Sequence, residues 1–190
     1  MFICFFKNIL YFMNLSDKLN CDISEIYIEA NNIKLNMPVV GENESETFIW
    51  NEVKEKYNKL GWIETKTPGW FSYGIIFNNE YCKDNSEHCP NTILLLEHLK
   101  MKFNIIHAGF SWFKKNTILK SHNDNNPEGE ITMHIGIDVP DNCWLIYDDG
   151  HKKYQHKNGE FIIFDPRKKH GAFNKSDKDR IILLVIAKPF

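Results

Sequence analysis

Short apolar runs alternate with polar turns throughout the second half of the chain. From residue 103 onward, eight such runs have the length and spacing of β-strands, and the breaks between them are rich in Asn, Asp, Gly and Lys. The predicted strands are Asn104–Phe113, Thr117–His122, Glu130–Val139, Cys143–Tyr147, Lys153–His156, Glu160–Phe164, Gly171–Asn174 and Arg180–Ala187. The pairs Asp149-Gly150 and Asn158-Gly159 indicate tight hairpins. This pattern predicts a two-sheet β-sandwich or jelly roll.

The first half of the chain has a mixed pattern. Ile26, Ile28 and Ala30 alternate with other residues, which predicts one or two short strands within residues 16–45. The expected elements that follow are a helix over Phe48–Leu60, an aromatic strand over Trp70–Phe77, a polar loop over Asn78–Glu87, and a second helix. That second helix starts at Asn91 or Thr92 as its cap, runs to about Lys102 and buries Leu95, Leu96 and Leu99.

No linker or internal repeat divides the chain. We therefore expect one mainly β domain with flanking helices over residues 1–190. Residues 1–68 would form a lead-in, and residues 69–190 would form the β core.

Alternation within the predicted strand Glu130–Val139 separates two faces. One face carries Ile131, Met133, Ile135 and Ile137, and the other carries Thr132, His134 and Gly136. A polar face with a histidine and a bare glycine is typical of an interior that holds a ligand. In the last strand, Arg180, Ile182 and Leu184 share a face, with the arginine at its entrance.

Composition narrows the class of protein. The chain has 190 residues, 43% hydrophobic and 14% aromatic content, and a formal net charge of −2, which indicate a folded protein rather than a disordered one. No basic stripe is present, so nucleic acid is not the expected partner. The apolar run Met1–Leu15 is too short to span a membrane; it is either an amphipathic packing helix or an extension before Met13. We expect a cytoplasmic protein.

Cysteine usage points away from a secreted disulfide scaffold and from a zinc knuckle. There are five cysteines, an odd number, and no Cys-x-x-Cys pair. Cys82 and Cys89 are near enough in sequence to bridge a loop, but spacing alone leaves a disulfide open.

The candidate chemistry lies at His122, Asp124 and His170. Two imidazoles and one carboxylate can occupy one face of a ferrous ion and leave the opposite positions open for a cosubstrate and oxygen. Ten residues after His170, Arg180 heads an apolar strand, where its guanidinium could bind a carboxylate through two hydrogen bonds. No Gly-x-Ser-x-Gly elbow, phosphate loop or dinucleotide fingerprint is present.

Each candidate also has a purely structural interpretation. His122 and Asp124 could belong to a polar turn, and Arg180 could pair on the surface with Asp177 or Asp179. His134 could be a fourth metal ligand, a cosubstrate contact or a hydrogen-bonded core histidine.

Taken in order, these motifs resemble the aspartyl/asparaginyl β-hydroxylase family over about Gly69 to Pro189. The resemblance is carried by Gly69-Trp70, the Cys82 and Cys89 pair, Thr92-Ile-Leu-Leu-Leu-Glu, Thr117-Ile-Leu-Lys-Ser-His, Met133-His-Ile-Gly-Ile, Val139-Pro140, Cys143, Asn158-Gly-Glu-Phe-Ile-Ile-Phe-Asp, His170, Asn174 and Arg180-Ile-Ile-Leu. It implies a double-stranded β-helix (jelly roll, cupin-like) that uses Fe(II) as cofactor and 2-oxoglutarate as cosubstrate.

The resemblance also implies roles for individual residues. His122 and His170 would bind iron, and Asp124 would supply a carboxylate where some family members have glycine. Arg180 would pair with the distal carboxylate of 2-oxoglutarate, and His134, Ser111 and Trp70 would complete the cosubstrate site. Two departures weaken or rearrange that site: Thr132 stands where the family often has arginine, and Lys115-Asn116 replaces Pro-Gly before the first metal strand.

The implied activity is a 2-oxoglutarate-dependent dioxygenase that hydroxylates a substrate side chain. The β-carbon of Asp or Asn in a peptide or protein is the first candidate substrate, and a free amino acid or a lipid acyl chain are others. The alternatives are a jelly-roll protein that binds metal without oxygenase activity, and an interaction module with a degenerate site. Oligomeric state does not follow from the sequence.

Overall fold

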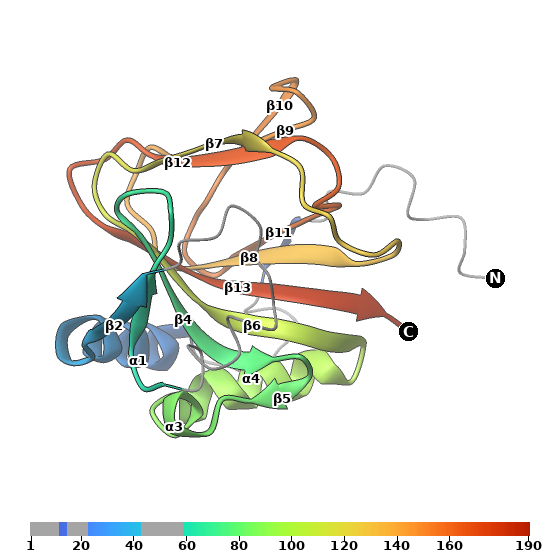
Figure 1. Cartoon of the computed structure of the whole chain (residues 1–190). Coiled ribbons are helices and arrows are strands. Elements are labelled where there is room, and N and C mark those ends of the chain that lie inside the picture. Colours follow the sequence, from blue (N-terminus) through green and yellow to red (C-terminus); the bar gives the residue numbers. More distant parts are fainter. Residues whose placement is uncertain (1–11, 15–22, 43–58) are drawn as a thin grey trace.

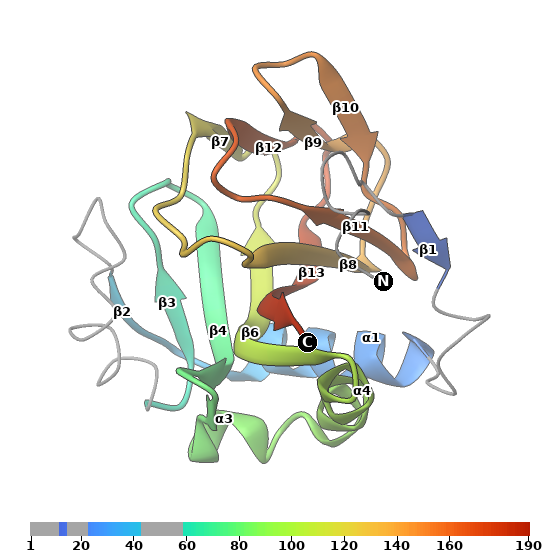
Figure 2. The same ribbon diagram turned by 90° about the vertical axis from the view of Figure 1, so that its right-hand side faces the viewer.

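The structure is a computed structural model that describes residues 12–14, 23–42 and 59–190. Two antiparallel-rich sheets lie face to face, and the described helices cover the opposite side of the larger sheet (Figures 1 and 2). The helices are α1 (Ile23–Asn36), α3 (Lys83–Ser86) and α4 (Pro90–Lys100). The protein is thus mainly β with a jelly-roll core, as the strand pattern predicts.

The large sheet has nine strands and the small sheet has four. In spatial order, the large sheet contains β1 (Phe12–Asn14), β11 (Glu160–Phe164), β8 (Ile131–Asp138), β13 (Arg180–Pro189), β6 (Phe103–Phe113), β4 (Trp70–Phe77), β3 (Trp62–Glu64) and β2 (Val39–Glu42), with β5 (Glu80–Tyr81) beside β4. The small sheet contains β10 (Lys152–Gln155), β9 (Cys143–Tyr147), β12 (His170–Asn174) and β7 (Ile118–His122). Of the described strand pairs, only β2 and β3 run parallel.

Side-chain alternation gives the large sheet two different sides. The helix side is its surface toward α1 and α4, and it includes Ile131, Met133, Ile135, Ile137, Ile181, Leu183 and Val185. These residues form one buried cluster with apolar residues of both helices, Ile26, Ala30, Ile33, Leu95, Leu96 and Leu99. The inner side faces the small sheet and carries the alternate residues of the same strands, among them Thr132, His134, Gly136, Arg180, Ile182 and Leu184.

The strand predictions from residue 70 onward are confirmed to within one or two residues at each end. Asp149-Gly150 forms the expected hairpin between β9 and β10, with positive φ at both residues. The hairpin expected at Asn158-Gly159 is wrong, because β10 belongs to the small sheet and β11 to the large one. That turn instead carries the chain across from one sheet to the other.

The prediction of short strands around residue 26 is wrong, because Ile23–Asn36 forms α1. Ile26, Ala30 and Ile33 are buried and lie at i, i+4 and i+7, which is helical spacing, whereas Ile28 and Leu35 are exposed. A run of Ile and Ala every two to four residues fits both periods, and packing against α4 and β8 decides in favour of the helix.

The predicted helix around residue 95 is confirmed as α4, but its predicted cap is wrong. Cys89 is the N-cap residue, but its side chain makes no hydrogen bond to the N-terminus of the helix. Buried Glu29 of α1 takes that role: its carboxylate accepts hydrogen bonds from the backbone N–H groups of Asn91 at 2.6 Å and Thr92 at 3.0 Å. It also accepts from the Thr92 hydroxyl at 2.7 Å. A carboxylate at a helix N-terminus satisfies free N–H groups and the helix dipole together.

Two further predictions concern the segment after β4 and the first part of the chain. The loop expected over Asn78–Glu87 contains β5 and α3, and Asn78 and Asn79 make the turn into β5 with φ of 50° and 66°. The helix expected over Phe48–Leu60 and the apolar run Met1–Leu15 lie largely outside the described residues. Within the described ranges, no helix has both the length and the apolar character needed to cross a membrane.

Candidate active site

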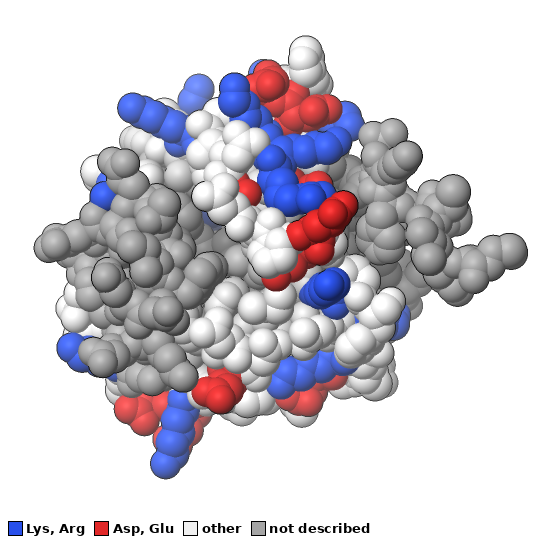
Figure 3. Space-filling model, turned by 45° about the vertical axis from the view of Figure 1, so that its right-hand side comes forward, with Lys and Arg blue, Asp and Glu red and all other residues white. Residues whose placement is uncertain are grey.

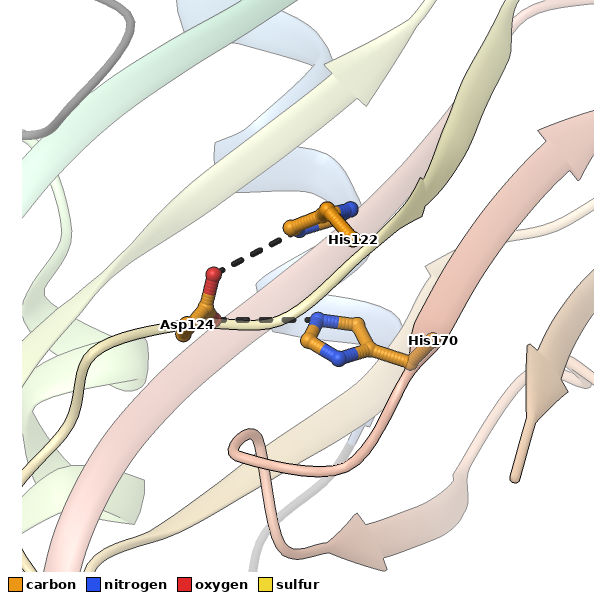
Figure 4. Close-up of side chains that lie close together, drawn as sticks. All are labelled: His122, Asp124 and His170. Atoms are coloured by element: carbon orange, nitrogen blue, oxygen red, sulfur yellow. Dashed lines mark ion pairs between the residues drawn. The ribbon is translucent and has the colours of Figure 1, made fainter. Parts of the chain in front are cut away.

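Three side chains expected to bind a metal converge at one edge of the space between the sheets. The potential ligand atoms of His122, Asp124 and His170 all lie within 4.8 Å of one another. The two carboxylate oxygens of Asp124 point to different histidines, with Oδ1 3.4 Å from His122 Nε2 and Oδ2 3.7 Å from His170 Nε2 (Figure 4). The polar-turn interpretation of His122 and Asp124 does not account for this convergence with His170.

Strand register brings the two histidines together across 48 residues of sequence. His122 ends β7 and His170 begins β12, and the two are direct partners in the small sheet. Their ring centroids lie 4.4 Å apart. The loop that carries Asp124 is tied to the turn before β12, because Asp124 N–H donates to Pro166 O at 3.0 Å and Asn123 Nδ2 donates to Arg167 O at 2.6 Å. Backbone pairing and these loop contacts therefore position all three side chains.

Both histidines have the same backbone contact, and it fixes their tautomer. His122 Nδ1 lies 2.8 Å from Lys120 O, and His170 Nδ1 lies 2.9 Å from Lys168 O. A carbonyl oxygen only accepts, so each Nδ1 carries the hydrogen and each Nε2 is left to face Asp124. Neutral imidazoles oriented in this way by a backbone carbonyl are the usual state of metal-binding histidines.

The two histidines have different surroundings. The hydrogen bond to Asp124 raises the pKa of His122, and burial lowers the pKa of His170. The His170 side chain is 7% exposed, whereas those of His122 and Asp124 are 35% and 38% exposed. The group is therefore open toward solvent on the His122 side and closed on the His170 side, so a substrate would approach past His122.

Arg180 lies inside the protein, not on its surface. It is 1% exposed, and its guanidinium carbon lies 3.8 Å from the ring centroid of Phe113. Its Nε and Nη1 atoms have no hydrogen-bond partner in the described part of the chain, and burial lowers its pKa to about 10. The alternative of surface pairing with Asp179 is wrong, because Asp179 binds Lys34 and Trp112.

Trp70 and Ser111 meet beside the same arginine. Trp70 Nε1 donates to Ser111 Oγ at 2.9 Å, and the Trp70 ring packs edge-on against Phe113 with 5.6 Å between centroids. Phe113 is the direct partner of both Trp70 and Arg180 in the sheet. The structure thus brings together Arg180, Trp70 and Ser111, which sequence reasoning assigned to one pocket.

His134 lies on the inner side, but its strongest contact is one that sequence reasoning missed. Its Nδ1 lies 3.0 Å from Nε2 of His156, a residue that the strand prediction covered without giving it a role. Burial, and after it the charge of Arg180, holds the pKa of both histidines well below the ordinary value. His134 is not among the residues whose ligand atoms converge with His122, so the structure does not support its use as a fourth metal ligand.

Buried polar atoms without partners gather on this side of the sheet. Within the described ranges they are Thr132 Oγ1, His156 Nδ1, Arg180 Nε and Arg180 Nη1. Unpartnered buried groups are costly, and in folded proteins they are few. Thr132 lies opposite Ile186, six residues along β13 from Arg180. The free atoms of Arg180 and that of His156, whose pKa is lowered by burial and by the arginine charge, therefore mark a place where a polar ligand would replace the missing partners.

The cysteines of the described residues take no part in a disulfide. Cys82, Cys89 and Cys143 are free and buried. Burial raises the pKa of the Cys82 and Cys143 thiols to about 11, so both are thiols at neutral pH. The bridge left open between Cys82 and Cys89 is not formed in this structure.

Charged residues of both signs lie on one face of the molecule. On the face shown in Figure 3, Lys and Arg side chains are interspersed with Asp and Glu. Two ion pairs lie close in sequence to His170: Arg167 binds Asp165, and Lys169 binds Asp149.

One family of known proteins matches most of the chain. The sequence model of the family described as aspartyl/asparaginyl beta-hydroxylase matches residues 30–188, a longer stretch than the motifs alone indicate. The chain is 27% identical over 134 residues to aspartate beta-hydroxylase domain-containing protein 2 from Xenopus tropicalis, covering 66% of this chain and 35% of that protein. It is 27% identical over 124 residues to ornithine lipid ester-linked acyl 2-hydroxylase from Rhizobium tropici, covering 65% and 42%. The chain thus spans less than half the length of these curated relatives.

Similar solved structures are distant in sequence. One is an oxidoreductase of the 2OG-Fe(II) oxygenase family from Burkholderia pseudomallei, with a TM-score of 0.47 and 12% identity over 63% of this chain and 66% of that one. Another is KdgF from Halomonas sp., with a TM-score of 0.43 and 11% identity over 68% of this chain and 86% of that one. The assignment of the fold rests on the two sheets described above rather than on these similarities.

Proposed function

Because the chain belongs to the aspartyl/asparaginyl β-hydroxylase family, we propose that it is an iron(II)- and 2-oxoglutarate-dependent hydroxylase. One observation carries the proposal: a His-Asp-His set with converging ligand atoms shares the space between the sheets with a buried arginine that has unpartnered N–H groups. A metal site alone would not require the arginine. A buried cation alone would not require the metal ligands.

The ligand set suits ferrous iron. His122 and His170 would bind through Nε2, because their Nδ1 atoms are engaged with backbone carbonyls. Asp124 would supply the carboxylate, and two imidazoles with one carboxylate leave positions open on the metal. Iron and 2-oxoglutarate, when bound, would supply oxygen activation coupled to decarboxylation of the cosubstrate to succinate and carbon dioxide. A metal would compete with protons for Nε2, and the raised pKa of His122 makes that competition stronger at His122.

The inner side of the large sheet would hold the cosubstrate. Arg180 would donate its free N–H groups to the distal carboxylate of 2-oxoglutarate, and such charge-assisted hydrogen bonds are the strong ones in proteins. Phe113 stacks on the guanidinium, and the Trp70–Ser111 pair borders it, so the cation is already oriented before a ligand arrives. Exclusion of water around Arg180 makes its charge act more strongly on a bound carboxylate.

The substrate proposal is hydroxylation of an Asp or Asn side chain in a peptide or protein. Substrate would enter past the half-exposed His122 and Asp124, since His170 is closed off by the protein. A second candidate is a lipid acyl chain, which the name of the Rhizobium relative favours. Both substrates present an unactivated C–H bond, so the two candidates require the same ligand set and the same cosubstrate.

Succinate release tests the proposal. Wild-type protein supplied with Fe(II), 2-oxoglutarate and oxygen should release succinate, and an accepted peptide or lipid should accelerate release and gain the mass of one oxygen atom. His170→Ala should abolish release because it removes a metal ligand, while His98→Ala, at a half-buried position of α4 on the other side of the large sheet, should release succinate like the wild type. Absence of succinate from folded wild-type protein with every substrate offered would defeat the proposal.

A further inference from the structure

His156 lies beside His134 in the space between the sheets. The two rings stack with 5.2 Å between centroids and 25° between planes, and His134 Nδ1 lies 3.0 Å from His156 Nε2. Both side chains are buried, at 7% and 2% exposure. The pair is therefore a closed contact with one shared hydrogen, out of reach of bulk water.

The fold holds His156 against His134 by backbone contacts on either side. Its own N–H donates to Cys143 O at 2.8 Å, and Gly159 N–H donates to Gly136 O at 2.9 Å. Gly136 is bare for this reason: a Cβ there would lie 2.0 Å from the carbonyl oxygen of Lys157. Gly136 was expected to leave room for a ligand. Its missing side chain instead makes room for the connection from β10 to β11, and that connection places His156 beside His134.

The position of the shared hydrogen follows from the surroundings of His156. Both imidazoles are neutral, because burial and the Arg180 charge lower their pKa values. His156 Nδ1 has no partner among the described residues. An N–H at that atom would be an unpartnered donor in the field of a cation, whereas a lone pair there is stabilised by the same charge. The hydrogen of His156 therefore sits on Nε2 and is donated to His134 Nδ1.

One consequence concerns the other nitrogen of His134. A neutral imidazole has one N–H, so a His134 ring that accepts at Nδ1 carries its own hydrogen at Nε2. Because Nδ1 is engaged with His156, only Nε2 remains to meet a ligand. Arg180, on the next strand, offers N–H groups in the same space, and its charge is near enough to add to burial in lowering the pKa of His134.

We propose that His156 is a positioning residue that holds His134 in the Nε2–H tautomer, so that His134 donates a hydrogen bond from Nε2 to the ligand bound by Arg180. The identity of that ligand as 2-oxoglutarate rests on the proposed function. The tautomer itself does not, because it is set by His156 and Arg180 alone. His156 would act through His134 and would not itself touch the reacting atoms.

The tautomer can be read in the metal-free protein. Long-range proton–nitrogen correlation spectra of the imidazoles distinguish a hydrogen on Nδ1 from one on Nε2. The expected result is Nε2–H for both His134 and His156, assigned by comparison with His134→Gln and His156→Gln. A spectrum in which His134 carries its hydrogen on Nδ1 would overturn the proposal, whatever the protein binds.

Cosubstrate affinity tests the consequence. Calorimetric titration with 2-oxoglutarate in the presence of Mn(II), a redox-inert stand-in for iron, would compare wild type with His156→Gln and His156→Phe. The Gln amide can donate from nearly the same place as Nε2–H, so its affinity should stay within about threefold of the wild type. Phe keeps the ring without a donor, and affinity should fall about ten- to hundredfold, the effect of one hydrogen bond to a charged group.

Controls separate the outcomes. Mn(II) affinity should be unchanged in both variants, because the metal ligands lie on other strands. Unchanged 2-oxoglutarate affinity in His156→Phe, or an equal loss in both variants, would overturn the proposal. If His156→Phe does not fold, the tautomer of wild-type His134 decides. If wild-type protein binds no 2-oxoglutarate, the proposed function fails, and the tautomer again decides the inference by itself.

Discussion

The two sides of the large sheet are built from the same strands but have opposite characters. On β8, Met133 and Ile135 point to the helix side and belong to the main apolar cluster. Their neighbours Thr132 and His134 point to the inner side, where the unpartnered buried polar atoms of the described residues gather. On the helix side, by contrast, both carboxylate oxygens of the buried Glu29 accept hydrogen bonds from the protein.

The contrast indicates which part of the sheet maintains the fold and which part is kept for a ligand. Each fully buried Leu or Ile contributes roughly 1.5–3 kcal/mol. A buried cation without a partner does the reverse, because desolvation costs several kcal/mol. Sites that break the rules of stable packing are the usual places for function. Variants on the two sides should therefore separate stability from ligand binding.

The largest effect on stability is expected on the helix side. Leu183→Ala leaves a cavity in the main cluster and should lower the free energy of unfolding by about 2–5 kcal/mol, measured by urea denaturation. The affinity for 2-oxoglutarate should not change in the folded fraction. Leu94→Ala, at an exposed position of α4, is the control and should stay within about 0.5 kcal/mol of the wild type. A stability loss as small in Leu183→Ala as in Leu94→Ala would remove the distinction between the sides.

Arg180→Met should give the opposite result. The affinity for 2-oxoglutarate should fall by about a hundredfold or more, since two charge-assisted hydrogen bonds of about 1.5–3 kcal/mol each are lost. The free energy of unfolding should be unchanged or higher, because an apolar side chain avoids the cost of a buried charge. Arg167→Met, which removes an exposed arginine paired with Asp165, serves as the control and should change neither quantity much. Unchanged 2-oxoglutarate affinity in Arg180→Met would contradict the assignment.

Glu29→Gln tests a buried polar contact on the helix side. The amide loses the charge at the α4 N-terminus and turns a donor toward N–H or O–H groups of Asn91 or Thr92. The free energy of unfolding should fall by about 1–3 kcal/mol without any effect on metal or 2-oxoglutarate binding. An unchanged free energy of unfolding in Glu29→Gln would contradict the role of this carboxylate in stabilising the N-terminus of α4. Glu97→Gln, at an exposed position of the same helix, is the matched control.

The comparison also predicts a pH dependence of the metal-free protein. Burial lowers the pKa of His134, His156 and His170, and lowers that of His107 to about 4. The ordinary pKa of histidine is 6.5. Below that pH these histidines bind protons in the unfolded chain but not in the folded chain, so the free energy of unfolding should fall as the pH drops from 6.5 toward 4.

His122 works in the other direction, because its pKa is raised and its stabilisation is lost as pH rises through that value. Because only His122 acts in this direction and four buried histidines act in the other, the free energy of unfolding should still fall on acidification. Urea denaturation across this pH range measures it, and His156→Gln should flatten the profile. A free energy of unfolding that rises on acidification would contradict the burial of these imidazoles.

Local patterns were enough to predict the strands and the three residues whose potential ligand atoms converge. Alternation assigned His134 and Arg180 to the inner side, and ligand chemistry selected His122, Asp124 and His170. Long-range packing was not predictable in this way. The period of Ile26, Ala30 and Ile33 is ambiguous until α4 lies against it, and the capping role of Glu29 joins residues 62 apart.

His156 was missed for a topological reason. Its contact with His134 depends on the connection from β10 to β11 crossing between the sheets over Gly136, whereas Asn158-Gly159 looks locally like a hairpin. Nothing in the residues around His156 signals that crossing. Alternation assigns the bare Gly136 to the inner side, but the reason for a glycine there lies in the carbonyl oxygen of Lys157, which packs against it.

The central claim is that His122, Asp124 and His170 form one metal site, and a calorimetric titration of metal-free protein with Mn(II) tests it most directly. Wild-type protein should bind one ion per chain, His170→Ala should bind none, and His98→Ala should bind like the wild type. Failure of the wild type to bind, or equal binding by His170→Ala, would contradict the claim.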